Sequence, residues 1–303
     1  MIGVLMYMKN NDKKRFLPFY DKIPEKFRDF IIKKYRPFLS EKNENDDILY
    51  ITLPLVYGEK KSNYEKWYNT IYNTLEKLNE FDITGVVLPE DDVFYSPVNV
   101  FRGRTINSLM AFETAKKCLK IKNKDIQKSE FVVIDGNEKF TDICLKSLVE
   151  NVNYLSVLTD REYFFDEIKE FSESERGLII NTFSNPKNQI LKDADVIVNC
   201  SSDMENQDYY YKRNSVYIDI VKNHGKSLRI IRKREDMLIV DGIGIKTDTG
   251  FFKSSLYEAK KYDENKIFRK YFDIYEDFYE AYSVLKEENA HVSSLYFMDK
   301  NIL

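Results

Sequence analysis

The sequence predicts a two-domain α/β protein in which one domain holds a mostly parallel β-sheet. The chain has 303 residues, enough for two domains of ordinary size, each with a buried core. Short apolar segments alternate with segments of helical spacing, which is the pattern of βαβ units. Several apolar segments, such as 196–198, lack polar alternation, as expected for strands that are covered on both faces.

The first third is expected to form an N-terminal α/β domain, residues 1–105. Its predicted strands are Ile2–Tyr7, Ile48–Leu53 and Gly85–Leu88, and its predicted helices are Pro24–Tyr35 and Tyr64–Leu78. Proline is favoured at the first position of a helix, which supports a start at Pro24. The polar segment Ser40–Asp47 predicts a surface loop.

Residues 106–250 predict the second domain. An amphipathic helix, Arg104–Leu119, leads into it. Six strands follow, with helical segments between several of them: Phe131–Ile134, Tyr154–Leu158, Leu178–Asn181, Val196–Asn199, Val216–Ile220 and Met237–Val240. Strands and helices that alternate at this spacing indicate a mostly parallel sheet.

The last segment, residues 251–303, predicts one long helix from Glu264 to Glu288. Apolar and aromatic residues recur there at steps of three and four: Phe268, Tyr271, Tyr275, Phe278, Tyr282 and Leu285. We expect this helix to pack back on the N-terminal domain, so that the second domain is inserted within the first. The alternative is a coiled-coil-like seam between two copies, which would make the protein a homodimer.

The composition argues against two classes of partner, nucleic acids and membranes. The formal net charge is −3, which argues against nucleic acid as the main partner because phosphate binding favours a basic face. No apolar run approaches the roughly 20 residues that cross a bilayer, so no membrane association is expected. The three cysteines, Cys118, Cys144 and Cys200, are scattered without metal-ligand spacing, which is typical of a reducing cytoplasm.

The turn at Asp135, Gly136 and Asn137 is the first candidate site. An apolar strand enters it and a helical segment leaves it, the setting in which a dinucleotide's pyrophosphate lies on a helix N-terminus. This pattern predicts a Rossmann-like domain. Only the first glycine of the usual G-x-G-x-x-G is present, with Glu138 and Thr141 at the other two positions. Because Glu138 adds bulk and negative charge, a fold that has lost its cofactor stays open as an alternative.

Asp160 and Arg161 follow the second predicted strand of this domain. An acidic residue there accepts the ribose hydroxyls of NAD, whereas an arginine holds the 2′-phosphate of NADP. Both cofactors therefore stay open. The alternative is a helix-capping aspartate beside a surface arginine.

A third group of candidates follows the later strands. Asn199, Ser201 and Ser202 lie where ligands of open α/β sheets bind, so they predict contacts with a nicotinamide ribose or a substrate, or else a simple turn. Gly242 and Gly244 permit close backbone approach near a ligand or a neighbouring domain, although turn chemistry also explains them. No basic partner for Cys200 is evident, which favours a buried structural thiol over a nucleophile.

Three segments together resemble the nucleotide-binding domain of the shikimate dehydrogenase-like family, which includes related fatty acyl reductases. They are Asp195–Ser202, Tyr217–Val221 and Asp241–Gly244. Thr105–Phe112 falls where that family places the helix joining its domains, and Thr159–Arg161 falls on its Asn-Arg-Thr turn. The resemblance implies an NAD- or NADP-dependent oxidoreductase acting on a small acid or carbonyl compound in an interdomain cleft. The chain lacks the family's lysine-containing substrate motif, so no catalytic residue is assigned.

The remaining polar residues give weaker signals. His224 and His291 are expected to be surface histidines without a carboxylate partner, although either can act as a general base near neutral pH. The acidic clusters 46–47 and 90–92 predict solvated loops rather than metal sites. Two hypotheses follow: an NAD(P)-dependent oxidoreductase, or a Rossmann-fold pseudoenzyme without cofactor that binds a protein, a peptide or another small ligand.

Overall fold

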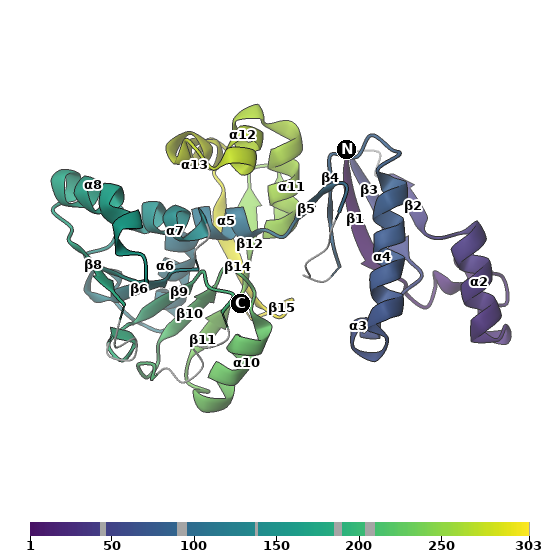
Figure 1. Ribbon diagram of the computed structural model, residues 1–303, viewed down its shortest axis with the longest axis horizontal. Coiled ribbons are helices and arrows are strands. Elements are labelled where there is room, and N and C mark those ends of the chain that lie inside the picture. The colour runs from purple at the N-terminus through teal and green to yellow at the C-terminus, as the bar shows by residue number, and fades with distance from the viewer. Residues whose placement is uncertain (43–46, 90–95, 137–138, 185–189, 204–209, 303) are drawn as a thin grey trace. The chain divides into compact units, whose positions relative to one another are not determined.

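The computed structural model describes residues 1–303 except 43–46, 90–95, 137–138, 185–189, 204–209 and 303. The chain divides into two compact units (Figure 1). Unit 1 comprises Met1–Arg102 and Ala259–Glu264, and unit 2 comprises Gly103–Glu258 and Asn265–Leu303. The structure is mixed α/β with parallel sheets, as the sequence predicts.

Unit 1 is built on one mainly parallel sheet. Its described elements are β1 (Ile2–Tyr7), α1 (Lys13–Phe16), α2 (Glu25–Tyr35), β2 (Leu39–Lys42), β3 (Ile48–Leu53), α3 (Glu59–Ser62), α4 (Tyr64–Leu78), β4 (Gly85–Val87) and β5 (Asn99–Phe101). The strand order is β2-β3-β1-β4-β5, and only β2 runs antiparallel to its neighbour among these described strands. The predicted surface loop at Ser40–Asp47 is therefore wrong in part, because its first residues pair with β3 while residues 43–46 lie outside the described residues.

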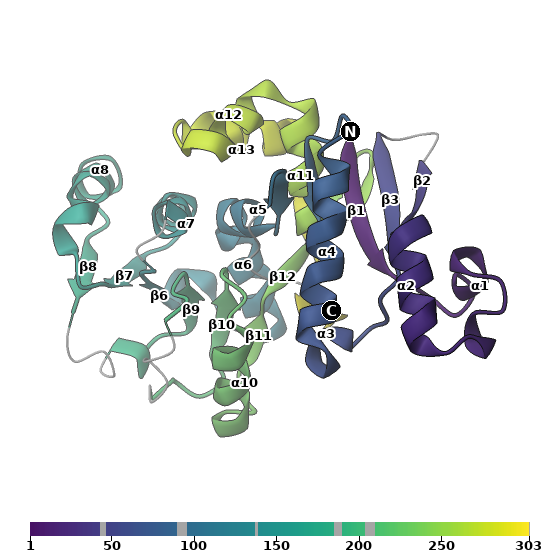
Figure 2. The same cartoon turned by 45° about the vertical axis from the view of Figure 1, so that its right-hand side comes forward.

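Helix α4 covers the sheet of unit 1 with a strongly apolar face. Trp67, Ile71, Leu75 and Leu78 are fully buried against Leu5, Ile51 and Val86 of the sheet. The indole nitrogen of Trp67 donates to the hydroxyl of Tyr7 at 2.9 Å, which fixes the helix against β1. Helix α2 lies beside α4 (Figure 2).

Unit 2 contains a parallel sheet with six described strands in the order β8-β7-β6-β9-β10-β11. The strands are β6 (Glu130–Ile134), β7 (Tyr154–Leu158), β8 (Ile180–Phe183), β9 (Val196–Asn199), β10 (Val216–Asp219) and β11 (Leu238–Val240). Counted along the chain from β6, this order is 3-2-1-4-5-6, the doubly wound arrangement of dinucleotide-binding domains.

Both faces of this sheet are covered. Phe131, Val133 and Val198 point to a face packed by α5 (Arg104–Leu109), α6 (Ala111–Ile121), α7 (Lys139–Val149) and α8 (Asp166–Arg176). Val132 and Ile197 point to the other face, which α10 (His224–Lys233) covers (Figure 2). Burial on two faces explains why these strands are continuously apolar. The predicted single helix at Arg104–Leu119 divides in two at Met110.

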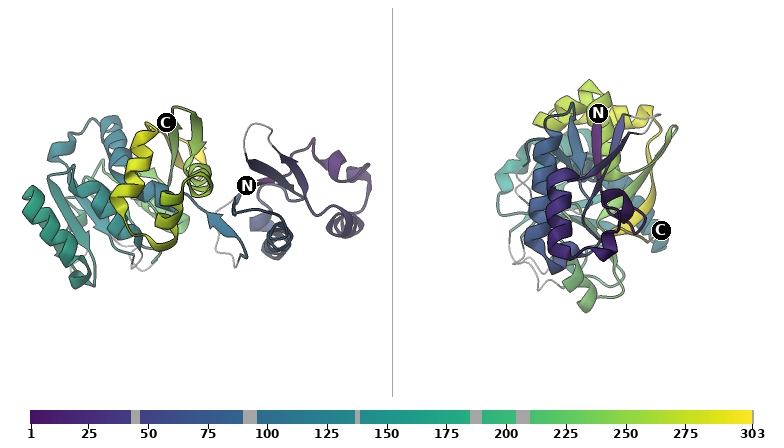
Figure 3. Two further views of the ribbon diagram at one scale, coloured as in Figure 1. Left: turned by 90° about the horizontal axis from the view of Figure 1, so that it is seen from above. Right: turned by 90° about the vertical axis from the view of Figure 1, so that its right-hand side faces the viewer.

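The predicted long helix at Glu264–Glu288 is wrong in both length and location. The chain instead forms α11 (Ser254–Glu264), α12 (Lys266–Ile274) and α13 (Phe278–Glu287). Asn265 caps α12 by accepting a hydrogen bond from the Phe268 amide at 3.0 Å, and Asp277 has left-handed backbone geometry. Helices α12 and α13, yellow-green to yellow in Figure 3, belong to unit 2. Their residues Phe268, Phe278 and Leu285 are part of the core of that unit, not of unit 1.

A small antiparallel sheet completes unit 2. Its order is β13 (Gly250–Lys253), β12 (Gly242–Thr247), β14 (His291–Phe297) and β15 (Lys300–Asn301). No helix in the described part of the chain is long and apolar enough to cross a membrane.

Candidate functional site

The candidate site lies at the carboxyl edge of the parallel sheet in unit 2. Strand order reverses between β6 and β9, and open α/β sheets bind ligands beside the carboxyl ends of strands at such a switch point. The turns that follow β6, β7, β9, β10 and β11 all lie along this edge. They contain the candidate residues that the sequence indicates.

Gly136 lets the turn after β6 contact the backbone of the turn after β9 at the switch point. A Cβ atom at this position would lie 1.7 Å from the carbonyl oxygen of Cys200, which follows β9. Only glycine therefore allows the turn after β6 to approach the turn after β9. The neighbouring residues Asn137 and Glu138, one a candidate ligand and the other the main argument for a lost cofactor, lie outside the described residues.

Asp135 is the centre of a buried ion pair. Its carboxylate is 2% exposed and accepts hydrogen bonds from Arg161 Nε at 2.8 Å and Nη2 at 2.9 Å. The hydroxyls of Thr159 and Thr141 donate to it at 2.7 and 3.0 Å. This hydrogen bonding with Asp135 raises the pKa of the Arg161 guanidinium, which also stacks 3.9 Å from the centre of the Phe164 ring. Arg161 is therefore a fixed, internally neutralised cation.

Thr141 links this ion pair to the start of α7. Its hydroxyl oxygen accepts a hydrogen bond from the Gly136 amide at 3.3 Å, and its proton goes to Asp135. The Gly136 amide, which the sequence assigns to a phosphate, thus has a partner inside the protein. Asp160, by contrast, is exposed at the carboxyl end of β7, next to Arg161.

A buried polar cluster lies below the turns after β9 and β10. The Asn199 amide donates to Asp219 Oδ1 and to the Ser201 carbonyl, both at 3.0 Å, and its oxygen accepts from Lys226 Nζ at 2.9 Å. Lys226 is 1% exposed and Asn199 is fully buried, so these groups support the edge from beneath. Burial raises the pKa of Asp219 above its usual range, although hydrogen bonds from Asn199 and Ser227 oppose the shift. No sequence pattern indicates that Lys226 is buried.

Ser201 and Ser202 lie above this cluster. The Ser201 hydroxyl accepts a hydrogen bond from the Asp203 amide at 3.1 Å, while the Ser202 side chain is exposed. The Ser202 carbonyl accepts from the Asn223 amide at 3.0 Å, which ties the turn after β9 to the turn after β10. Cys200 is fully buried, and its sulfur lies 3.8 Å from that of Cys144. Burial raises the pKa of the Cys200 thiol, so the expectation of a buried structural thiol is confirmed.

His224 is a candidate residue whose carboxylate partner the sequence does not reveal. It begins α10 instead of lying in a loop, and its Nε2 lies 3.0 Å from Oδ2 of Asp241, the residue after β11. The carboxylate of Asp241 is 4% exposed and also accepts from the Met298 amide at 2.8 Å. Hydrogen bonding to Asp241 raises the pKa of His224, an effect that burial and Lys222 oppose and that Asp219 reinforces. The expectation that this histidine lacks a carboxylate partner is wrong.

Gly242 and Gly244 both lie within β12, so the predicted turn at this point is wrong. A Cβ at Gly244 would lie 2.2 Å from the Ser294 hydroxyl, whereas one at Gly242 would have an ordinary 3.6 Å contact with Tyr296. Gly244 thus serves strand packing, and only Gly242 has room around it. His291 is exposed, as expected for a surface histidine, and no cluster of metal-ligating side chains is found among the described residues.

Comparisons with known proteins give low similarity throughout. No family model and no curated protein match the chain. Among solved structures, shikimate 5-dehydrogenase from Listeria monocytogenes, in complex with shikimate and NAD, is 10% identical with a TM-score of 0.35, covering 79% of this chain and 84% of that one. L-tryptophan dehydrogenase from Nostoc punctiforme is 14% identical with a TM-score of 0.37, covering 95% and 82%. Likenesses of this size carry no information about the activity of this chain.

Proposed function

We propose that this protein is a nicotinamide-dinucleotide-dependent oxidoreductase that acts on a small acid or carbonyl compound. The observation that supports it most is the doubly wound strand order of unit 2, with an exposed acidic residue, Asp160, at the carboxyl end of the second strand. Fold alone does not define function, so the proposal also depends on the groups along that edge.

A dinucleotide would meet two restrictions along this edge, because the Gly136 amide already donates to Thr141 and Arg161 is already paired with Asp135. Asp160 would accept the adenosine ribose hydroxyls, the turn at Gly136 and the start of α7 would face the pyrophosphate, and Ser201, Ser202 and Gly242 would face the nicotinamide end. Arg161 is already neutralised by Asp135, so a 2′-phosphate would have to compete with a bidentate ion pair. We therefore expect NAD(H) to bind more tightly than NADP(H).

His224 is the proposed proton-exchanging residue. When bound, the cofactor supplies hydride transfer, and the protein must then accept or supply a proton at the substrate oxygen. His224 has the partner that orients an imidazole, and its side chain is 37% exposed beside the last two strands. Because hydrogen bonding to Asp241 raises its pKa, substrate oxidation, which needs neutral His224, should be favoured at higher pH. Carbonyl reduction, which needs the protonated ring, should weaken over the same range.

Cofactor titration tests the proposal directly. NADH and NADPH would be titrated separately into the purified protein, with heat and nicotinamide fluorescence followed together. We expect NADH to bind, and we expect Asp160→Ala to weaken it by about tenfold, the loss of one hydrogen bond to a charged group. Glu173→Gln, an exposed change on α8, is the matched control. Absence of binding by either nucleotide at about 1 mM would exclude the proposal.

A second candidate is a Rossmann-fold pseudoenzyme that binds another ligand without a dinucleotide. Asp135 favours it, because its buried carboxylate, directly after β6, already accepts hydrogen bonds from Arg161 and Thr141, where the sequence predicts contacts with a dinucleotide. This candidate predicts that neither nucleotide raises the thermal stability of unit 2, whereas a bound cofactor must raise it.

A further inference from the structure

Unit 1 contains a hollow of about 510 Å³ between α2 and α4. This volume lies within the range of small-molecule sites, which is about 300–1,000 Å³. The lining residues all belong to unit 1: Asp29, Ile32, Pro37, Pro54, Lys66, Asn69, Thr70, Asn73, Thr74, Glu76, Lys77 and Glu80. The hollow is therefore separate from the candidate dinucleotide site of unit 2.

One wall of the hollow is a polar row along α4. Lys66, Thr70, Asn73 and Lys77 recur at steps of four, three and four, which places them on one face of the helix, and Glu80 follows just beyond the helix end at Leu78. The apolar face of α4 is buried in the core of unit 1, so the orientation of this polar row is fixed. Across from it, Ile32, Pro37 and Pro54 supply apolar surface.

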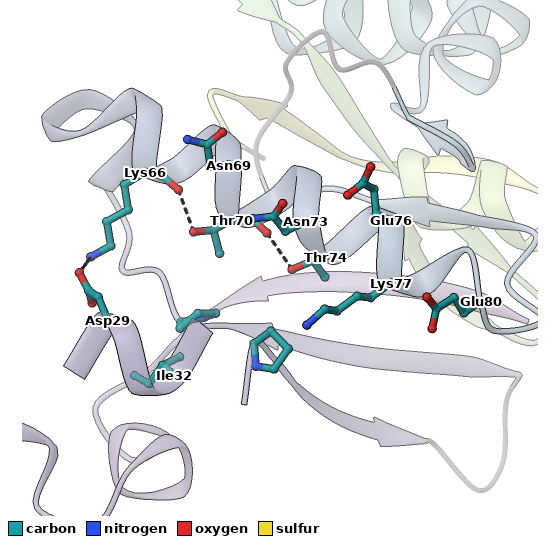
Figure 4. Close-up of a pocket in the computed structure, with 12 residues that line it drawn as sticks. Asp29, Ile32, Lys66, Asn69, Thr70, Asn73, Thr74, Glu76, Lys77 and Glu80 are labelled. Atoms are coloured by element: carbon teal, nitrogen blue, oxygen red, sulfur yellow. Dashed lines mark hydrogen bonds and ion pairs between the residues drawn. The ribbon is translucent and has the colours of Figure 1, made fainter. Parts of the chain in front are cut away.

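The two lysines of the row differ in their ionic partners. Lys66 Nζ lies 2.8 Å from Glu59, 3.2 Å from Asp29 and 3.8 Å from Glu25, so its charge is neutralised. Lys77 has no ion pair or hydrogen bond from its ammonium group within the described residues. Figure 4 shows its side chain directed along the hollow, with the ammonium group extending away from Glu80, while the Glu76 side chain points to the other side of the helix.

The other polar groups of the row are available for hydrogen bonding. The hydroxyls of Thr70 and Thr74 donate to backbone carbonyls one turn earlier, at 2.7 and 2.8 Å, which leaves their oxygens as acceptors (Figure 4). The side-chain amide of Asn73 has no partner among the described residues. A ligand in the hollow would thus meet one cation, an amide and two hydroxyl oxygens facing an apolar surface, with the Glu80 carboxylate at one end.

We propose that this hollow binds a small organic acid. The ligand's carboxylate pairs with the Lys77 ammonium, its polar groups bond to Asn73 and the Thr70 hydroxyl, and its apolar body covers Ile32, Pro37 and Pro54. An acid is favoured over an amine at this end of the hollow, because the acidic lining residue Asp29 is already paired with Lys66 and the Lys77 ammonium is directed away from the acidic residue Glu80. This inference does not depend on the function proposed for unit 2.

A matched pair of probes tests the charge requirement in the full-length protein. Phenylacetate and phenylacetamide have the same shape but differ in charge, and neither contains an indole. Binding can be followed by the fluorescence of Trp67, the single tryptophan, which lies on α4. We expect phenylacetate to bind with a Kd of about 1 mM, as its size allows, and phenylacetamide to bind at least tenfold more weakly. Amide NMR signals of Thr70, Asn73 and Thr74 should shift on binding.

Charge removal at Lys77 completes the test. Lys77→Gln removes the charge and keeps a polar side chain of good helix propensity at an exposed helix position, so the fold should persist, as circular dichroism can check. It should weaken phenylacetate to the level of phenylacetamide and leave phenylacetamide unchanged. Lys61→Gln, an exposed lysine of α3 outside the hollow, should leave both affinities within about twofold. Equal binding of the two probes, full affinity in Lys77→Gln, shifts confined to other surfaces, or no binding at about 20 mM would each overturn the proposal.

Discussion

Two ion pairs along the carboxyl edge of unit 2, one beside β6 and β7 and the other beside β10 and β11, have nearly the same geometry but opposite chemical behaviour. Beside β6 and β7, the Asp135 side chain is 2% exposed and that of Arg161 is 28% exposed, and Arg161 Nε lies 2.8 Å from Asp135 Oδ2. Beside β10 and β11, the Asp241 side chain is 4% exposed and that of His224 is 37% exposed, and His224 Nε2 lies 3.0 Å from Asp241 Oδ2. Arginine does not release its proton in proteins, whereas histidine does so near neutral pH. The first pair is therefore a permanent anchor and the second is a titratable group.

Substitution of Gly136, which lies at the switch point between β6 and β9, should have the largest effect on stability. Gly136→Ala would place a Cβ 1.7 Å from the backbone oxygen of Cys200, so β6 and β9 must separate at the switch point. We expect the free energy of unfolding to fall by about 3 kcal/mol or more, the upper range for overpacking. Chemical denaturation measures this loss.

Gly242→Ala is the control for that change, because its Cβ would meet only an ordinary 3.6 Å contact. It should cost less than about 1 kcal/mol. Similar losses in the two variants would mean that the close contact at Gly136 does not hold the switch point together.

Removing Arg161 should have the next largest effect, since it leaves the Asp135 carboxylate buried without its cation. Arg161→Met should lower the free energy of unfolding of unit 2 by about 3 kcal/mol, as expected when one partner of a buried pair is lost. Hydrogen exchange of the β6 and β7 amides measures this loss specifically in unit 2. Arg232→Met, an exposed change on α10, should stay within about 0.5 kcal/mol.

A double variant separates the ion pair from other effects of the arginine. Asp135→Asn combined with Arg161→Met removes both charges and should recover part of the loss, because no unpaired charge then remains buried. A simple sum of the two single losses would show that the pair contributes little and that Arg161 acts through its stacking on Phe164.

The sequence predicted the regular elements better than the site. β1, β3, α4, β7 and β9 begin and end where their apolar patterns do, because each pattern is complete within one element. Helices α12 and α13 are predicted as one because the aromatic spacing continues across Asp277, even though the backbone turns there. Periodicity records which face is apolar, and it does not detect a capped break.

The ion pairs of the edge could not be predicted because their partners are brought together only by the sheet. Arg161 and Asp135 lie 26 positions apart and meet because β6 and β7 are neighbours. His224 and Asp241 meet through the neighbours β10 and β11. The polar row of α4 is visible in the sequence, but the same spacing is equally typical of a solvent-facing helix surface.

The smallest effect on stability is expected at the titratable pair His224 and Asp241, and it depends on pH. The chain has two histidines, so His291→Gln leaves His224 as the single imidazole in an NMR titration. Asp241→Asn should lower the pKa of His224, because hydrogen bonding to Asp241 is the main cause that raises it.

The sign of the accompanying stability effect follows from the raised pKa of His224. The paired, protonated histidine should stabilise unit 2 by about 0.5 kcal/mol, the size of a half-exposed ion pair. This contribution is full below the unfolded pKa of about 6.5 and is lost as pH rises through the higher folded pKa. A pKa unchanged by Asp241→Asn would make His224 an ordinary surface histidine. The contrast would then lie between a buried anchor and a chance surface contact, and the proposed proton exchange would have no basis.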